Sequence, residues 1–284
     1  MTLCLRSQNA LLDDIEARLR DPSNYRWSET EIYRALNDAL RQWDGRVFVP
    51  AIYEPGSTWP TSVATVTIPT GIDPASVQLQ VRELPVENMD IVLDQWFDMA
   101  GWRNEPTVAF GAQARSYFQP ESEYRLLYWI TNGAVPLTVP TLDAELSDTA
   151  TSLTLATTAD VGDNGFLLLG NEWLHYRGLE RGATTLTLQN LTRGLLTSVA
   201  ATHAALTPVY WCVATTRQDL FGQLLDQARA YLHEMTLVAA SPQSRDVHER
   251  MVSYYQARAD AFWRKYWPTR GPRWKIELRD DSTL

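Results

Sequence analysis

The first fifty residues show hydrophobic positions at the spacing of two amphipathic helices. One apolar stripe runs from Leu11 to Leu19 and ends before Pro22. The second helix opens with Ser28 and Glu31, which form an S-x-x-E capping box at its amino end. Its apolar stripe comprises Ile32, Ala35, Leu36, Ala39, Leu40 and Trp43.

Between residues 47 and 130 the hydrophobic period changes from about 3.6 residues to about 2. The segments "VQLQVRE" (77–83) and "EYRLLYWI" (123–130) alternate as strands do, and prolines punctuate the whole stretch. No helical pattern long enough for a parallel crossover separates the predicted strands. We therefore expect a small antiparallel sandwich or barrel.

A second β segment follows the proline-containing connector "NGAVPLTVPTL". Short alternations at 153–155, 166–168, 173–176 and 186–188 predict brief strands. We interpret residues 141–208 as a separate small β module with close ends, inserted into the chain. Its removal is expected to leave the rest folded.

Helical spacing returns at 219–240 and 247–267, and "SPQSRD" between them supplies a stop and a new start. The last helix carries two apolar stripes. Either one faces the chain's own core and the other a neighbouring subunit, or both lie in a single core. The first stripe is Val247, Met251 and Tyr254, and the second is Tyr255, Ala259, Phe262 and Tyr266.

The chain ends with a predicted strand after a Gly-Pro break. Trp274, Ile276 and Leu278 alternate with polar positions, and Arg273 and Lys275 lie among them. Such a terminal strand either closes the chain's own sheet or adds to the sheet edge of a partner. We expect these five residues to contact a neighbouring protein.

These patterns predict an α+β fold. It consists of an α-helical bundle (the N-terminal helices plus a C-terminal helical hairpin), an antiparallel β domain and the inserted module. The predicted domains are a main core of residues 1–140 plus 209–284, with an extended tail at 268–284, and the module at 141–208.

Composition narrows the classes of function. The net charge of −9 argues against a general duplex-binding surface, because phosphate binding needs lysine and arginine to replace counterions. Eleven tryptophans and twelve tyrosines favour protein interfaces. No apolar run is long enough for a membrane span, and no secretory signal precedes Asp13, so we expect a cytoplasmic product. Cys4 and Cys212 fit no metal or disulfide spacing.

A search for catalytic patterns identifies no site. The pair His233–Glu234 lacks the second histidine of an H-E-x-x-H zinc motif, and no nucleophile elbow, P-loop or dinucleotide-binding loop occurs. We therefore predict no catalytic residue, no metal and no cofactor. A glycosidase-like carboxylate pair stays open as an alternative, since such residues are distant in sequence.

The helix "RWSETEIYRALNDALRQW", the strand end "VTIPTGI", the series Trp102, Pro106, "FQP" and "YRL", and the helical hairpin together resemble the head-to-tail connector (adaptor) proteins of tailed bacteriophages. The resemblance covers about residues 8 to 130 and 215 to 267.

Residues 146–211 resemble a small β module of phage virion proteins, whose pattern pairs "I-G-x-E-x-x-x-Y" with "R-G-x-x-G-T-x-A-x-x-H". Leu196 stands where a glycine is usual in this pattern. His203 is expected to hydrogen-bond within the closing loop of the module. The residues that match the pattern are Gly170, Glu172, Tyr176, Arg193, Gly194, Thr197 and His203.

The resemblance implies a structural virion protein at the neck, where head and tail meet. Such adaptors form a homo-oligomeric ring, usually dodecameric, between the portal protein and the tail or a tail-completion protein. DNA passes through the ring without sequence-specific binding, no membrane is involved, and the protein is made in the host cytoplasm. A tail-completion protein is one alternative. Another is a carbohydrate-binding protein that uses Trp59, Trp96, Trp102 and Trp173 as stacking platforms.

Overall fold

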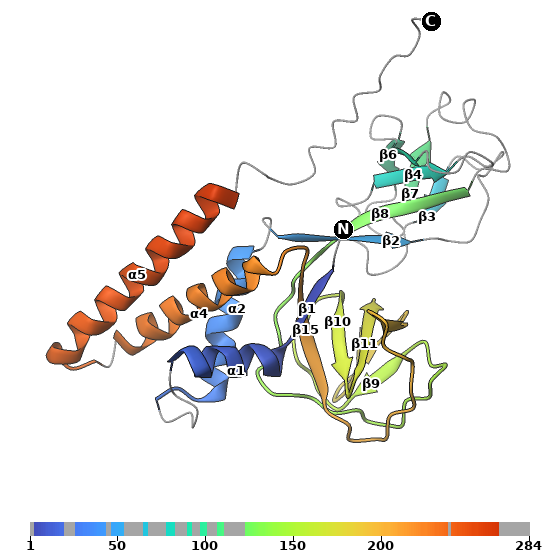
Figure 1. The fold of residues 1–284 in the computed structure, drawn as a ribbon. Coiled ribbons are helices and arrows are strands. Elements are labelled where there is room, and N and C mark those ends of the chain that lie inside the picture. Colours follow the sequence, from blue (N-terminus) through green and yellow to red (C-terminus); the bar gives the residue numbers. More distant parts are fainter. Residues whose placement is uncertain are drawn as a thin grey trace, which may run out of the picture. The chain divides into compact units, whose positions relative to one another are not determined.

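The computed structural model has helices and antiparallel sheets, as expected of an α+β protein (Figure 1). The chain divides into two compact units. The first comprises Met1–Val49 and Ile130–Thr269, and the second Pro50–Trp129 and Arg270–Leu284. The structure describes residues 3–19, 26–43, 47–53, 65–67, 78–82, 90–92, 97–100, 107–110, 123–237 and 240–266.

The helices of the first unit confirm the helical pattern of the sequence. They are α1 (Gln8–Leu19), α2 (Glu29–Trp43), α4 (Asp219–Leu237) and α5 (Pro242–Tyr266). Helix α4 packs against each of the other three. The capping box also forms as predicted. The backbone N–H of Ser28 donates to Glu31 Oε2 at 2.8 Å, and the N–H of Glu31 donates to Ser28 Oγ at 3.4 Å.

Two sheets complete the first unit. The larger has the strand order β1, β15, β10, β11, β14, and the smaller has the order β12, β13, β9, with antiparallel pairing throughout. The strands are β1 (Cys4–Ser7), β9 (Leu153–Leu155), β10 (Asn164–Leu169), β11 (Glu172–Arg177), β12 (Leu179–Arg181), β13 (Leu186–Leu188), β14 (Thr192–Leu195) and β15 (Val209–Thr215).

The limits of the first unit differ from those predicted for an inserted module at 141–208. The ends of that segment are close, as expected, because Thr141 and Pro208 form a β-bridge. Its strands, however, share the larger sheet with β1 and β15, which lie outside the segment. The predicted boundary at 208 therefore cuts the sheet between β10 and β15.

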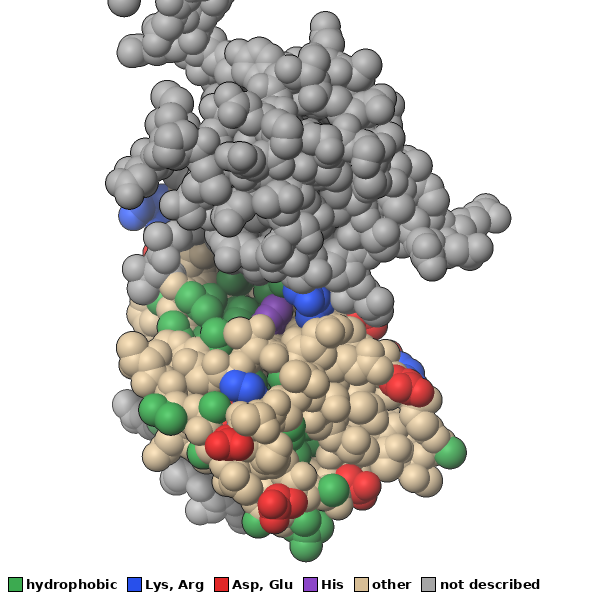
Figure 2. Space-filling view, turned by 90° about the vertical axis from the view of Figure 1, so that its right-hand side faces the viewer, with side chains coloured by type: hydrophobic (Ala, Val, Ile, Leu, Met, Phe, Trp, Pro, Cys, Tyr) green, Lys and Arg blue, Asp and Glu red, His purple; other side chains and the backbone are tan. Residues whose placement is uncertain are grey.

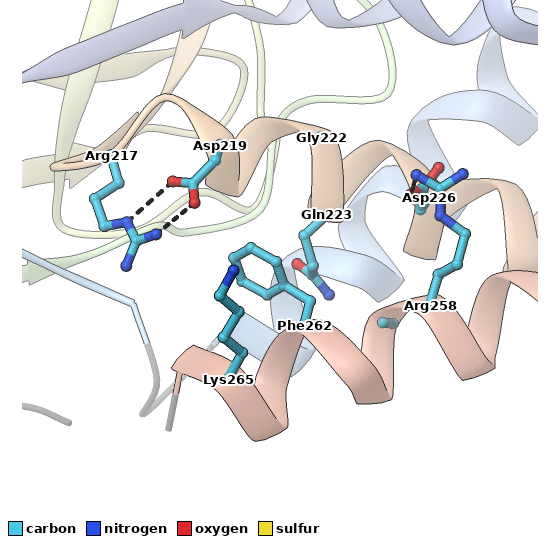
Figure 3. A pocket seen from close by; sticks show the side chains of 9 residues that line it. Arg217, Asp219, Gly222, Gln223, Asp226, Arg258, Phe262 and Lys265 are labelled. Atoms are coloured by element: carbon cyan, nitrogen blue, oxygen red, sulfur yellow. Dashed lines mark hydrogen bonds and ion pairs between the residues drawn. The ribbon is translucent and has the colours of Figure 1, made fainter. Parts of the chain in front are cut away.

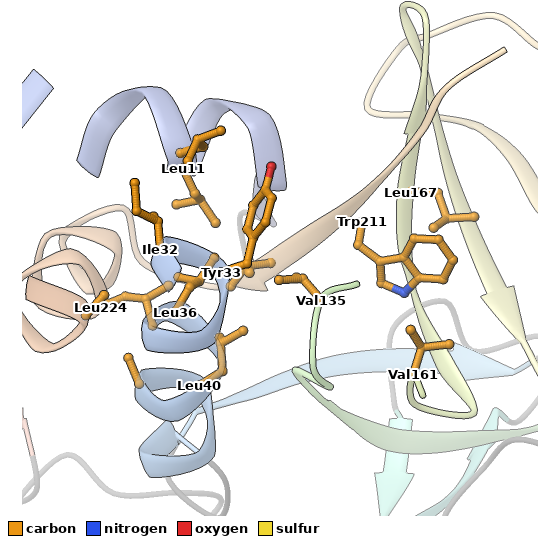
Figure 4. Packing of buried hydrophobic residues seen from close by; sticks show 14 of the residues in the cluster. Leu11, Ile32, Tyr33, Leu36, Leu40, Val135, Val161, Leu167, Trp211 and Leu224 are labelled. Carbon is orange, nitrogen blue, oxygen red and sulfur yellow. The ribbon is translucent and has the colours of Figure 1, made fainter. Parts of the chain in front are cut away.

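A single hydrophobic core joins the helices to this sheet. Tyr33 on α2, Val135 in the connecting segment and Trp211 on β15 are all buried in it (Figure 4). Buried amides reinforce the junction. Asn37 Nδ2 donates to Val135 O at 2.9 Å, and Gln8 Oε1 accepts from the backbone N–H of Trp211 at 2.9 Å. The helices and the segment 141–208 thus belong to one folding unit.

The second unit contains antiparallel strands in two sheets. One sheet has the order β2, β8, β4, β5, and the other has the order β3, β7, β6. The predicted strands at 77–83 and 123–130 correspond to β4 and β8 of the first sheet. The bounds are β2 (Phe48–Tyr53), β3 (Thr65–Thr67), β4 (Gln78–Arg82), β5 (Asp90–Val92), β6 (Phe97–Ala100), β7 (Thr107–Phe110) and β8 (Glu123–Thr131).

Candidate functional site

A buried carboxylate lies at the centre of the residues that match the virion-module pattern. Glu172 begins β11, directly after the turn that connects this strand to β10, and its residue is only 2% exposed. Gly170 in that turn has a φ of 55°, in the left-handed region that glycine adopts without steric cost. This tight turn pairs Glu172 with Leu169 at the end of β10, and the side chain of Glu172 is buried there.

Four hydrogen bonds surround the Glu172 carboxylate. Arg193 on β14 donates from Nε to Oε1 at 2.6 Å and from Nη2 to Oε2 at 2.7 Å. The backbone N–H of Ala201 reaches Oε2 at 3.1 Å, and His203 Nε2 lies 2.8 Å from the same oxygen. The partner of His203 is therefore Glu172, on a distant strand, and not the closing loop that the sequence suggested.

The Arg193 guanidinium extends this network to two further segments. Nη1 donates to the carbonyl of Ser147 at 2.7 Å, and Nη2 donates to the carbonyl of Ala201 at 2.7 Å. Leu146 and His203 exchange backbone hydrogen bonds of 2.9 Å in both directions. One ion pair therefore holds strands β11 and β14 and the segments around residues 147 and 202 together.

The loop after Arg193 depends on left-handed backbone conformations. Gly194 has a φ of 67°, Leu196 of 51° and Thr197 of 68°. A Cβ on Gly194 would lie 3.0 Å from the carbonyl oxygen of Ser198, so the loop closes tightly over this glycine. Leu196 and Thr197 occupy the left-handed region in spite of their side chains.

Tyr176 belongs to a separate contact at the other end of β11. Its hydroxyl donates to the carbonyl of Gly162 at 2.9 Å and accepts from Trp211 Nε1 at 3.3 Å. A Cβ on Gly165 would lie 3.0 Å from the tyrosine ring, so this glycine leaves room for the ring beside β10. Burial raises the pKa of the Tyr176 hydroxyl, which stays protonated.

The electrostatics of Glu172 suit a structural clamp. Burial alone would raise its pKa, but the hydrogen bonds from Arg193, His203 and Ala201 outweigh burial and lower the pKa to about 2. The carboxylate is therefore ionised at neutral pH, and both of its oxygens accept hydrogen bonds from the protein. A general base or a nucleophile needs an oxygen directed at a substrate, which this geometry does not offer.

A second polar cluster lies between α4 and α5, around a cleft of about 500 Å³ (Figure 3). Asp219 pairs with Arg217, with a distance of 3.0 Å between Arg217 Nε and Asp219 Oδ1. Asp226 is buried and pairs with Arg258 at 2.9 Å, and Gln223 Oε1 accepts from Trp43 Nε1 at 2.6 Å. Each acid of the cleft thus has a basic neighbour. No group of three or more metal-ligating side chains occurs within the described residues.

The two remaining sequence hypotheses are only partly covered by the structure. The predicted contact residues Arg273, Trp274, Lys275, Ile276 and Leu278 lie outside the described residues. So do Trp59, Trp96 and Trp102 of the carbohydrate-binding alternative, while Trp173 is half-buried on β11.

Sequence reasoning identified most of the Glu172 network but missed its backbone members. The pattern named Glu172, Arg193 and His203 without pairing them, whereas Ser147 and Ala201 contribute main-chain atoms that no residue type reveals. The basic neighbours of Asp226 were also missed. Arg229 follows Asp226 by three positions on α4, a spacing from which this ion pair could have been predicted. Arg18 and Arg258 lie on other helices, so no sequence spacing indicates their contact with Asp226.

No family model, curated protein or solved structure matches the chain. Among the helices of the described segments, none combines the length and the apolar character needed to cross a membrane.

Proposed function

We propose that the chain is a structural subunit of a tailed-phage virion, which forms a ring between portal and tail and lets DNA pass. One observation carries the proposal. Gly170, Glu172, Arg193, Gly194 and His203, which carry the resemblance to a virion module, come from separate parts of the sequence and meet in one buried network. We expect this convergence if the pattern marks a structural module, because the residues that define such a module must contact one another in the fold.

The chemistry of the network supports a scaffold role and no reaction. Its carboxylate has hydrogen-bond partners on both oxygens, and its arginine is directed at main-chain carbonyls of two other segments. These contacts hold loops in place over the sheet. We therefore propose a binding and assembly function in place of catalysis, with the portal protein and a tail or tail-completion protein as partners.

Charge is consistent with a DNA passage. The net charge of −9 gives little attraction for phosphate, so DNA would meet a wall that does not retain it. We propose that DNA contacts are transient and independent of sequence.

Labelling of native particles tests the proposal directly. Antibodies raised against the chain should mark one spot at the junction of head and tail in electron micrographs of virions. Infection with a phage in which the gene is interrupted should yield DNA-filled heads separated from tails. Label along the tail shaft, or complete particles without the protein, would contradict the neck position.

Truncation tests the proposed role of the C-terminal residues. A chain that ends before Gly271 should fold but fail to join heads, because Trp274, Ile276 and Leu278 would no longer add a strand to a partner. Deletion of 280–284 alone is the matched control, since it keeps those three residues. Normal incorporation of the longer truncation would refute this role.

A further inference from the structure

Helix α5 has one buried and one exposed apolar face. Tyr255 and Ala259 are buried against α4. Val247 and Tyr254, which lie seven positions apart, are 58% and 53% exposed, and Met251 between them is half-buried. Val247, Met251 and Tyr254 therefore form a single stripe along the helix, here called the α5 stripe, and its two outer members are each more than half exposed.

The surroundings of the α5 stripe are basic. Helix α5 carries five basic and three acidic side chains. Arg258 continues the stripe by one helical turn, with its guanidinium 5.6 Å from the centre of the Tyr254 ring, and its side chain is about half exposed. Asp226 neutralises only part of this charge, because Arg18 and Arg229 also lie within 4 Å of its carboxylate.

A second exposed apolar surface lies on the loops that close the β-sheet end of the first unit. Val199 is 79% exposed and Leu206 is 73% exposed, and both belong to the segment after Arg193. The N–H of Leu206 donates to the carbonyl of Leu142 at 2.9 Å, so the loop that carries Leu206 lies beside the segment that begins at Leu142. We call this surface, Val199 and Leu206 with residues 143–148, the loop face.

The loop face is acidic. Segment 141–208 contains seven acidic and three basic residues, and one of the acidic ones, Glu172, is buried. Asp143, Glu145 and Asp148 are exposed on the segment that is hydrogen-bonded to the loop carrying Leu206. Figure 2 shows acidic side chains beside hydrophobic ones at the lower end of the described surface.

We propose that the loop face of one copy packs against the α5 stripe of the next copy. The two surfaces complement each other, since each has an apolar centre and one is rimmed by acidic and the other by basic groups. They are different surfaces of the same chain, so the contact is head-to-tail, and a head-to-tail contact that closes makes a ring. This inference rests on the proposed ring function and names the surfaces that build it.

Cysteine crosslinking tests the contact. In a chain with Cys4→Ser, the pair Leu206→Cys and Tyr254→Cys is treated with a short bis-maleimide; Cys212 stays buried. A head-to-tail contact yields a ladder of dimers, trimers and larger species on a denaturing gel. Each single cysteine variant yields almost none. Both substituted side chains are exposed, so the fold is retained, which circular dichroism verifies.

Other crosslinking outcomes would overturn the proposal. Dimers from Tyr254→Cys alone would indicate a symmetric contact between two α5 helices in place of the head-to-tail one. The absence of a ladder from the folded double-cysteine variant, up to the highest soluble concentration, would also overturn it.

A charge-reversal pair tests the electrostatic part. Arg250 and Glu145 are both exposed. Arg250→Glu or Glu145→Arg alone, introduced into the double-cysteine chain, should lower the initial crosslinking rate about tenfold, and the two reversals together should restore most of it. Equal rates in all four chains would refute the charge complementarity.

The crosslinking and the virion labelling can fail independently. A protein found at the neck whose double-cysteine variant forms no ladder would retain the proposed function and lose this contact. A ladder from a protein that is absent from the neck would retain the contact and lose the function.

Discussion

At the scale of single residues, stability is expected to depend most on Glu172. Glu172→Gln removes the charge that faces the nearly buried Arg193 guanidinium, and breaking a buried ion pair in this way costs about 3 to 5 kcal/mol. Urea unfolding of the variant and of the parent chain measures the loss. Glu180→Gln is the matched control, because Glu180 is exposed on the neighbouring strand β12 and should change the free energy of unfolding by less than about 0.5 kcal/mol.

Acid should destabilise the chain in two steps. Burial, with Arg177 nearby, lowers the pKa of His175 to about 4, and burial, with His248, Arg229 and Arg26 nearby, lowers that of His233 to about 4. Because the unfolded chain binds these protons from pH 6.5 downward, stability is full above pH 6.5 and falls toward pH 4.

Glu172 adds the second step. Its folded pKa of about 2 lies below the ordinary 4.5, so its contribution is present above pH 4.5 and is lost as the pH falls toward 2. Urea midpoints measured at half-unit steps from pH 7 to pH 2 check both windows. His175→Gln combined with His233→Gln should flatten the curve between pH 6.5 and 4; an unchanged slope there would show that other groups are responsible.

The left-handed loop offers a test with two opposite outcomes. A left-handed conformation costs a non-glycine residue about 1 to 2 kcal/mol, and glycine costs about 0.5 to 1 kcal/mol in backbone entropy. Leu196→Gly is therefore expected to be neutral or to stabilise by up to about 1 kcal/mol. Gly194→Ala should destabilise, because its Cβ would press on the carbonyl of Ser198. Thermal unfolding measures the stability of both variants. A lower stability of the Leu196→Gly variant would contradict backbone strain at Leu196.

At the scale of elements, the amino end of α2 depends on the Ser28–Glu31 box. Ser28→Ala removes the hydroxyl that accepts from the Glu31 N–H and donates to its carboxylate, a loss of about 1 kcal/mol. Thr30→Ala, in the same first turn of α2, is the control. Equal effects of the two substitutions on the free energy of unfolding would show that the cap adds little.

The elements differ in how much of them could be predicted. The spacing of apolar residues and their capping signals predicted each of the helices in the described segments within a few residues, because both signals come from neighbouring positions. Strand β1 (Cys4–Ser7) was missed. It is four residues long, and it forms only through pairing with β15, some two hundred positions later. The pattern of four residues does not indicate a partner strand so distant in the sequence.

At the scale of the whole molecule, the shared core changes what a deletion should do. Removal of 143–208 takes β10 away from β15 and exposes Trp211, which packs on Tyr176. We now expect this deletion to abolish cooperative unfolding. Excision of 50–129, with a short Gly-Ser linker, should instead leave the first unit folded, because the division of the chain falls there. Near-ultraviolet circular dichroism through a thermal scan compares the two variants. Cooperative melting of the variant that lacks 143–208 would support the interpretation of this segment as an independent module.

Local features of this protein can be derived from its residues alone: the helix positions and the Ser28 cap, the alternation of strands such as β8, and the residue types of the Glu172 network. Which of these groups meet depends on how the chain packs in three dimensions. Glu172, Arg193 and His203 pair across thirty-one positions, and one core spans the helices and the segment 141–208. The physical reason is the distance along the chain over which each interaction acts. Propensity, capping and periodicity act between neighbours, whereas a buried ion pair or a strand pair is selected by packing the whole chain.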